Sequence, residues 1–136
     1  MAFQKRRCVV AVSGFFEWKR SGKAKQAYYI TRADGHPLGM AGLWESWSSA
    51  DGEVVESCTV ITKPPVAPMV QIHNRMPAIL TLDRADGWLD DGEHDRDALR
   101  GLLLAPSPDL TAVAVSSYVN SVAHQGSECI GVAADA

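Results

Sequence analysis

Long hydrophobic runs are missing from this sequence of 136 residues, where the longest are short stretches such as Leu102 to Ala105. A membrane-spanning helix needs roughly 20 consecutive apolar residues, so no such helix is expected. The N-terminal residues Met1 to Arg7 carry charge but precede no apolar stretch of signal-peptide length, which argues against export. Hydrophobic residues make up 46% and charged residues 21% of the chain, a balance that excludes a disordered or fibrous protein.

Cysteine is also scarce, and Cys8, Cys58 and Cys129 lie far apart in the sequence. No Cys-x-x-Cys pair occurs, and no grouping of cysteine and histidine has the spacing of a zinc site. We therefore expect three reduced thiols in a cytoplasmic protein, with no metal and no cofactor. A phosphate-cradling glycine loop and a Gly-x-Ser-x-Gly nucleophile elbow are both absent from the sequence.

Charge is unevenly distributed along the chain, although its net value is only −3. Seven of the 13 lysines and arginines fall in the first 25 residues, and seven of the 16 acidic residues fall between Asp83 and Asp97. A chain with one basic and one acidic region can bind a polyanion on its basic side while staying acidic overall. Solvated surface charge explains the same distribution, and charge alone favours that interpretation.

Apolar and β-branched stretches separated by turn residues predict a series of strands. The predicted strands are residues 8–13, 15–18, 27–31, 39–47, 54–62, 77–82 and 110–116. Tight turns between neighbours favour antiparallel pairing, and no regular alternation of strand and helix occurs. The sequence therefore predicts one α+β domain over residues 1–136, with a mainly antiparallel or mixed sheet, or a small barrel, and short helices packed outside.

Helices are predicted only late in the chain, over residues 83–89 and 95–104, and Pro106 stops the second one. Residues 63–68 hold three prolines and are predicted to form a loop, because proline supplies no backbone N–H. Residues 119–136 are predicted to be irregular.

The first candidate cluster for chemistry is the run Gly14-Phe15-Phe16-Glu17-Trp18, directly after a predicted buried strand. If Phe16 and Trp18 enclose Glu17, desolvation raises the pKa of its carboxyl group, a property that suits a general acid or base. The alternative is a glutamate at a strand end that faces water and pairs with a neighbouring lysine or arginine. The pentapeptide by itself favours this alternative.

The second candidate cluster is Ile72-His73-Asn74-Arg75-Met76-Pro77, between the proline-rich loop and a strand, where functional residues often lie. His73 can exchange a proton near neutral pH, and the guanidinium of Arg75 offers five donors that suit phosphate. The alternative is a hydrogen-bonded structural histidine. An arginine two positions away makes the two interpretations equally good.

These clusters, in this order, resemble the SOS response-associated peptidase (SRAP) family, which acts in DNA repair. Each matching segment is weak alone, but together they run nearly from end to end of the chain. The segments are residues 6–10 with 14–19, 41–45, 58–62, 72–77, 88–89, and 119–122 with 125–126.

The resemblance implies binding of single-stranded DNA that contains an abasic site, with peptidase- or lyase-like processing. In the family, an N-terminal cysteine reacts through its amine and thiol with the ring-opened sugar, and a glutamate and a histidine support the proton transfers. By motif match, Glu17 and His73 are these two catalytic residues. Arg75 matches a contact to DNA phosphate, Trp18 lies at the family's DNA face, and Thr62 matches a position that lines the site.

One departure concerns the nucleophile, because the family begins Met-Cys-Gly-Arg and residue 2 here is Ala2. Cys8 is internal and has no free α-amine, so we expect a chain that lacks the family's N-terminal segment and forms no permanent DNA adduct. The expected partners are abasic single-stranded DNA and either a complementing N-terminal segment or a second copy bound at an open sheet edge, with no membrane. The alternative function is a non-catalytic single-stranded DNA-binding module or an inactive fragment.

Overall fold

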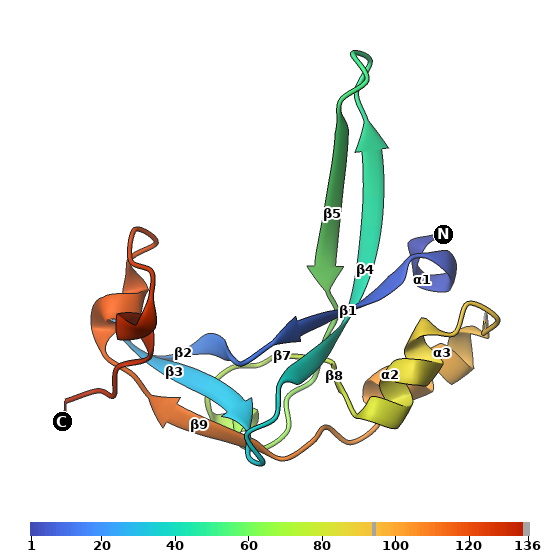
Figure 1. Ribbon diagram of the computed structural model, residues 1–136. Coiled ribbons are helices and arrows are strands. Elements are labelled where there is room, and N and C mark those ends of the chain that lie inside the picture. Colours follow the sequence, from blue (N-terminus) through green and yellow to red (C-terminus); the bar gives the residue numbers. More distant parts are fainter. Residues whose placement is uncertain (94, 135–136) are drawn as a thin grey trace. The chain divides into compact units, whose positions relative to one another are not determined.

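The computed structural model describes residues 1–93 and 95–134, which divide into two compact units (Figure 1). The first unit contains Met1–Val12, Leu38–Lys63 and Pro77–Pro108. The second contains Ser13–Pro37, Pro64–Met76 and Asp109–Ala136. Each unit therefore combines segments that lie far apart in the sequence, and the single domain expected over residues 1–136 stays a prediction.

The first unit is built on an antiparallel sheet in which β4 (Leu38–Ser48) is the central strand. β1 (Arg7–Val12) pairs with one edge of β4, while β5 (Val54–Val60) and β8 (Ile79–Leu80) pair with its other edge. Gly42 in β4 lies between these neighbours. A Cβ atom there would come within 2.8 Å of the Thr59 carbonyl oxygen, so the close approach of the strands requires glycine.

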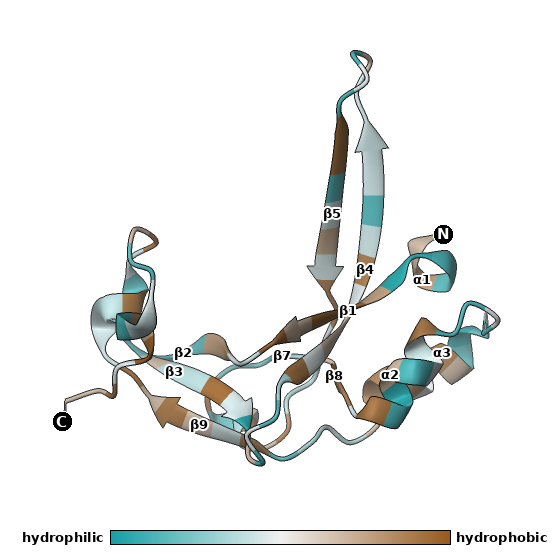
Figure 2. Ribbon diagram, in the orientation of Figure 1, coloured by the Kyte–Doolittle hydropathy of each residue, from teal (hydrophilic) through white to brown (hydrophobic). Residues whose placement is uncertain are grey.

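Two amphipathic helices, α2 (Leu82–Leu89) and α3 (Arg96–Leu104), pack against this sheet. Both carry a mixture of hydrophilic and hydrophobic residues (Figure 2). Trp88 of α2 is fully buried, and its indole N–H donates to the carbonyl of Cys8 at 2.9 Å. The Asp95 carboxylate accepts from the backbone N–H groups of Asp97 and Ala98, which caps α3 at the predicted start.

Arg7 joins three segments of the first unit, although only 8% of the residue is exposed. Its guanidinium donates to five backbone carbonyls at 2.6–3.1 Å, those of Phe3, Gln4, Trp88, Asp90 and Glu93. These acceptors belong to α1 (Ala2–Lys5), a helix not expected from the sequence, to the last turn of α2 and to the loop that follows it. The guanidinium carbon also lies 5.6 Å from the centroid of the Trp88 ring.

The second unit contains a three-stranded antiparallel sheet in the order β2 (Phe15–Ser21), β3 (Ala24–Arg32) and β9 (Leu110–Ala114). Its core includes Ile30 of β3, which is fully buried. Three 3-10 turns complete it: η1 (Met69–Gln71), η2 (Ser117–Asn120) and η3 (Ser127–Ile130). The two-residue strands β6 (Thr62–Lys63) and β7 (Met76–Pro77) lie where the chain passes between the units.

The predicted α+β class with mainly antiparallel strands and short helices is confirmed. Within the described residues the sheets are open, so the small barrel expected as an alternative does not form. The tail expected to be irregular includes η3 and a bridge between Val115 and Val132, and its residues 135 and 136 lie outside the described part. No helix in residues 1–93 and 95–134 has the length and apolar character required to cross a bilayer.

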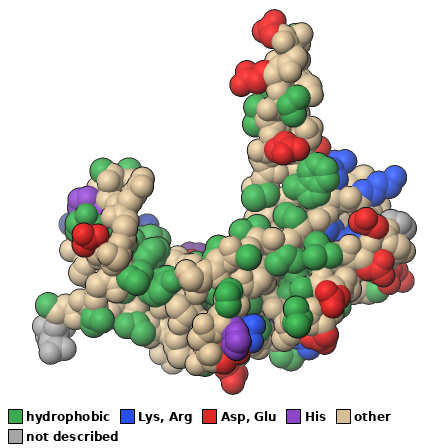
Figure 3. Space-filling model, viewed as in Figure 1, with side chains coloured by type: hydrophobic (Ala, Val, Ile, Leu, Met, Phe, Trp, Pro, Cys, Tyr) green, Lys and Arg blue, Asp and Glu red, His purple; other side chains and the backbone are tan. Residues whose placement is uncertain are grey.

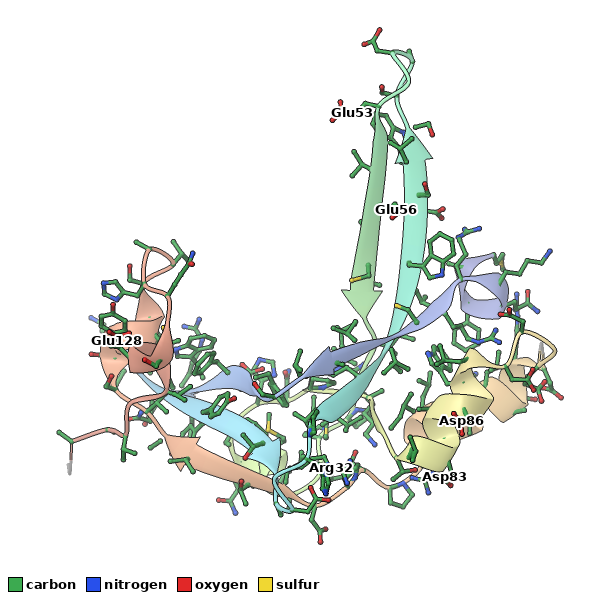
Figure 4. All side chains as sticks on the ribbon, viewed as in Figure 1. Arg32, Glu53, Glu56, Asp83, Asp86 and Glu128 are labelled. Atoms are coloured by element: carbon green, nitrogen blue, oxygen red, sulfur yellow. The ribbon has the colours of Figure 1, made fainter. Side chains whose placement is uncertain are left out.

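Acidic side chains gather in the first unit, as the red surfaces in Figure 3 show. Glu53 and Glu56 lie on the β4–β5 hairpin, and Asp83 and Asp86 project from α2 (Figure 4). Much of the acidic region found in the sequence thus belongs to the unit that carries α2 and α3. The basic β2–β3 hairpin belongs to the other unit.

Replacing Arg7 with lysine should lower the free energy of unfolding by about 3 kcal/mol, because an ammonium cannot reach five carbonyls and leaves buried acceptors unpaired. Denaturation with urea, followed by tryptophan fluorescence, measures this loss. Arg6→Lys is the matched control, since Arg6 forms a partly exposed ion pair with Glu45 and its replacement should cost less than about 1 kcal/mol. Equal losses in the two variants would contradict the role assigned to Arg7.

Candidate functional site

Glu17 lies on β2, which is an edge strand of the sheet in the second unit. N–H groups that point away from the sheet at such an edge have no strand partner. Oε1 of Glu17 accepts a hydrogen bond from the backbone N–H of the next residue, Trp18, at 3.0 Å. The Glu17 side chain is 23% exposed, so the carboxylate is held against the strand edge and still reached by solvent.

His73 follows η1 and brings its imidazole to this carboxylate, with Nε2 at 3.8 Å from Oε1 of Glu17. Nδ1 of His73 accepts from the backbone N–H of Arg75 at 3.1 Å. An accepting Nδ1 carries no proton in the neutral ring, so the single ring proton lies on Nε2 and faces Glu17. In the charged ring, Nδ1–H can donate to the Arg75 carbonyl at 3.2 Å. Both protonation states therefore have partners, which suits a group that exchanges protons.

A cavity of about 280 Å³ adjoins the Glu17–His73 pair within the second unit. Its lining combines the Glu17–His73 pair with two cations, an indole, an amide and two valines. The lining residues are Glu17, Trp18, Arg20, Lys25, His73, Val119, Asn120 and Val122. Because the cations outnumber the one carboxylate, the charges that line the cavity favour an anion over a cation beside the Glu17–His73 pair.

The indole of Trp18 is fixed at the wall of this cavity. Its Nε1–H donates to Oδ1 of Asn120 at 2.6 Å, and Nζ of Lys25 lies 5.8 Å from the ring centroid. Phe16 is two residues away on β2, with its ring centroid 6.4 Å from that of Trp18. The polar partners of the Glu17 carboxylate are thus a backbone N–H and an imidazole, while the aromatic rings pack with one another.

A second hollow of about 470 Å³ shares Arg20 and His73 with the first. Lys19 adds a third cation, and the remaining wall comes from the loop and turn around η1: Pro65, Val70, Gln71, Ile72 and Asn74. The two hollows therefore adjoin along β2. Together they present cations over a longer path than either one alone, which suits an extended polyanion.

A cavity of about 590 Å³ in the first unit has a different character. It is mainly apolar and is lined by Cys8, Val9, Val10, Trp44 and Cys58 among others. Burial, and to a smaller extent the nearby Cys58, raises the pKa of the Cys8 thiol, which disfavours the nucleophilic thiolate. In the part of the chain that the structure describes, no cluster of three histidine, cysteine or acidic side chains could hold a metal ion.

The structure brings Glu17, Trp18 and His73 together in one cavity. Arg75 is exposed and contacts His73 through its backbone, while Thr62 lies on β6 of the first unit. The roles given to all five residues stay predictions.

Five further lining residues were missed by sequence reasoning, of which three are polar or charged: Arg20, Lys25 and Asn120. Arg20 and Lys25 belong to the basic N-terminal region, but only the β2–β3 register places them opposite each other. Asn120 lies in residues 119–122, one of the segments that resemble the family, and this resemblance could have identified it as a site residue.

A family model described as SOS response associated peptidase (SRAP) matches residues 1–122. The chain is similar to the abasic site processing protein YobE of Bacillus subtilis (strain 168), with 39% identity over 118 residues that cover 85% of this chain and 54% of YobE. It is also 39% identical over 148 residues to the abasic site processing protein HMCES of Xenopus tropicalis, covering 94% of this chain and 44% of HMCES. The chain spans about half the length of the curated relatives it matches.

Solved structures share the fold. A crystal structure of a protein from Bacteroides thetaiotaomicron matches with a TM-score of 0.85 and 26% identity, covering 96% of this chain and 59% of that one. A protein from Bordetella bronchiseptica matches with a TM-score of 0.74 and 30% identity, covering 85% and 57%. The family resemblance seen in the sequence is confirmed.

Neutral His73 should be the Nε2–H tautomer, because the Arg75 backbone N–H occupies Nδ1. Nitrogen-15 NMR of the histidine ring, recorded in alkaline solution where the ring is neutral, distinguishes the two tautomers. Arg75→Ala keeps the backbone N–H and should leave the tautomer unchanged, which separates the backbone contact from any effect of the guanidinium. An Nδ1–H tautomer in the unaltered protein would refute this account of the site.

Proposed function

Because the chain belongs to the SOS response-associated peptidase family, we propose that it recognises and processes abasic sites in single-stranded DNA, with Glu17 and His73 as its acid–base pair. The observation that carries this proposal is the 3.8 Å approach of Nε2 of His73 to Oε1 of Glu17 at the wall of a cation-lined cavity. A cytoplasmic location, suggested by three free thiols, belongs to the same proposal.

The size of the cavity supports a small, base-free ligand. At about 280 Å³ it is slightly smaller than the range of roughly 300–1,000 Å³ that is common for small-molecule sites. A single sugar without its base is a ligand of suitable scale, whereas a complete nucleotide is larger. Val119 and Val122 contribute apolar wall, and Asn120 contributes an amide beside the indole of Trp18.

The charges around the cavity support a phosphate backbone as the remainder of the ligand. Arg20 lies at both hollows, Lys25 lines the first and Lys19 lines the second. Cations spaced in this way can contact the phosphates on either side of one sugar, and each contact releases a counterion. The adjoining hollow then accommodates the neighbouring nucleotides of the DNA. Arg75 is a further phosphate contact in this proposal.

The chemistry of an abasic site explains the acid–base pair. Its ring-opened sugar is an aldehyde, and attack by an amine requires a proton to leave nitrogen and another to reach oxygen. Glu17 and His73 can perform these transfers, since each exchanges a proton and the two groups face each other. None of the described lining residues is a cysteine, so the cavity itself supplies no thiol for a thiazolidine.

Binding of abasic single-stranded DNA should weaken about ten-fold for Arg75→Ala and for Arg20→Ala, with the slope of log K against log salt falling by about 0.7 per lost phosphate contact. Fluorescence anisotropy over a salt series measures both quantities. Arg100→Ala removes a cation from α3 of the first unit and is the matched control, expected to bind like the unaltered protein.

Glu17→Gln should leave the affinity for the same DNA nearly unchanged, because Glu17 transfers protons and makes no phosphate contact. The same anisotropy titration checks this expectation. Loss of affinity in Glu17→Gln together with full affinity in Arg75→Ala would reverse the roles assigned to these two residues. An affinity that does not change with salt concentration would exclude the phosphate contacts.

A further inference from the structure

The Glu17–His73 cavity has a single primary amine among its described lining residues, that of Lys25. Lys25 lies near the start of β3, opposite Arg20 in the β2–β3 ladder. Its Nζ is 5.8 Å from the centroid of the Trp18 ring, and the indole is held by Asn120. The β2–β3 register and the indole thus place the amine at the same cavity as the acid–base pair.

The neighbourhood of this amine leaves it available for reaction. None of the ion pairs among the described residues involves Lys25, so no carboxylate holds its nitrogen. A cation–π contact positions an ammonium without forming a directional bond to it. Arg20 lines the same cavity, but a guanidinium stays protonated and is a poor nucleophile.

We propose that Lys25 forms a reversible imine with the aldehyde carbon of a ring-opened abasic sugar in this cavity, an inference that rests on the function proposed above. The lysine amine is a nucleophile that enzymes use for such carbonyl chemistry. The product is a covalent hold on the lesion that water can undo. It differs from a permanent bond through a cysteine, because no thiol takes part.

The step balances in atoms and charge. The Lys25 ammonium first loses a proton to Glu17 or His73, and the amine lone pair then attacks the aldehyde carbon, forming a carbon–nitrogen bond as the carbonyl oxygen takes up that proton. A second nitrogen-bound proton is then passed to the hydroxyl group of this carbinolamine. The carbon–oxygen bond breaks, water leaves with both protons, and a protonated imine remains on Lys25.

The two other lysines of the hairpin provide internal comparisons. Lys19 lines the adjoining hollow with His73, and Lys23 lies in the tight turn between β2 and β3, outside both hollows. All three side chains carry the same amine. A reaction that depends on the cavity should therefore select Lys25, whereas a reaction that depends only on basic charge should not distinguish among them.

The test incubates the purified chain with single-stranded DNA bearing one abasic site, with and without sodium cyanoborohydride, and runs a heated denaturing gel. A shifted band is expected only with the reductant, because hydride converts the imine to a stable amine. Lys25→Arg keeps the positive charge and should reduce the trapped band at least about ten-fold, while Lys23→Arg should match the unaltered chain. Glu17→Gln should slow trapping by about a hundred-fold without altering DNA affinity.

Peptide mapping identifies the attachment site independently of the variants. Trypsin should fail to cleave after Lys25 in the trapped complex, and the peptide spanning Lys25 should carry the sugar remnant. Attachment to Lys19, to Lys23 or to the N-terminal amine would overturn the assignment.

A tetrahydrofuran analogue of the abasic site has no aldehyde and measures binding alone. If the chain binds this analogue but no band is trapped on the abasic strand, the inference about Lys25 is wrong and the proposed function stands. If the chain binds neither DNA, the proposed function fails and this inference fails with it.

Discussion

The buried guanidinium of Arg7 is the constraint on which the first unit depends. A charge removed from water is tolerated only when its donors are satisfied, and here five backbone carbonyls take the place of a carboxylate. Those carbonyls come from α1, from the last turn of α2 and from the loop beyond it, so one side chain of β1 sets where these segments lie. The same arrangement buries Trp88, whose indole bonds back to β1 through Cys8.

In the second unit, a backbone N–H group at the edge strand β2 also needs a hydrogen-bond partner. The side chain that supplies this partner belongs to the candidate site. The N–H of Trp18 points away from the sheet and is satisfied by the carboxylate of Glu17. That contact fixes Glu17 at the strand edge, where His73 faces it from a separate segment. The backbone of Arg75 in turn orients the imidazole. The Glu17 carboxylate thus both satisfies a backbone N–H at the sheet edge and forms half of the proposed acid–base pair.

Acidic side chains are concentrated in the first unit, while the second unit contains a basic hairpin. The acidic hairpin β4–β5 and helices α2 and α3 belong to the first unit, while the β2–β3 hairpin carries five lysines and arginines against the single acid Glu17. The negative net charge of the whole chain therefore gives no indication of the cationic site in the second unit. Similarity to abasic site processing proteins over about half their length gives that site a candidate ligand, and Lys25 gives it a candidate covalent chemistry.

Most strands and the helices α2 and α3 followed from the sequence by itself, because apolar periodicity, turn residues and the prolines around residue 106 act locally, whereas α1 did not. The candidates Glu17 and His73 could also be recognised there, since each lies in a distinctive short motif. Other features needed tertiary structure. Nothing local indicates that Arg7 meets carbonyls some 80 positions away, or that Lys25 and Asn120 line a cavity with Glu17. Strand register and the packing of distant segments decide such neighbours, and these depend on contacts that no sequence window contains.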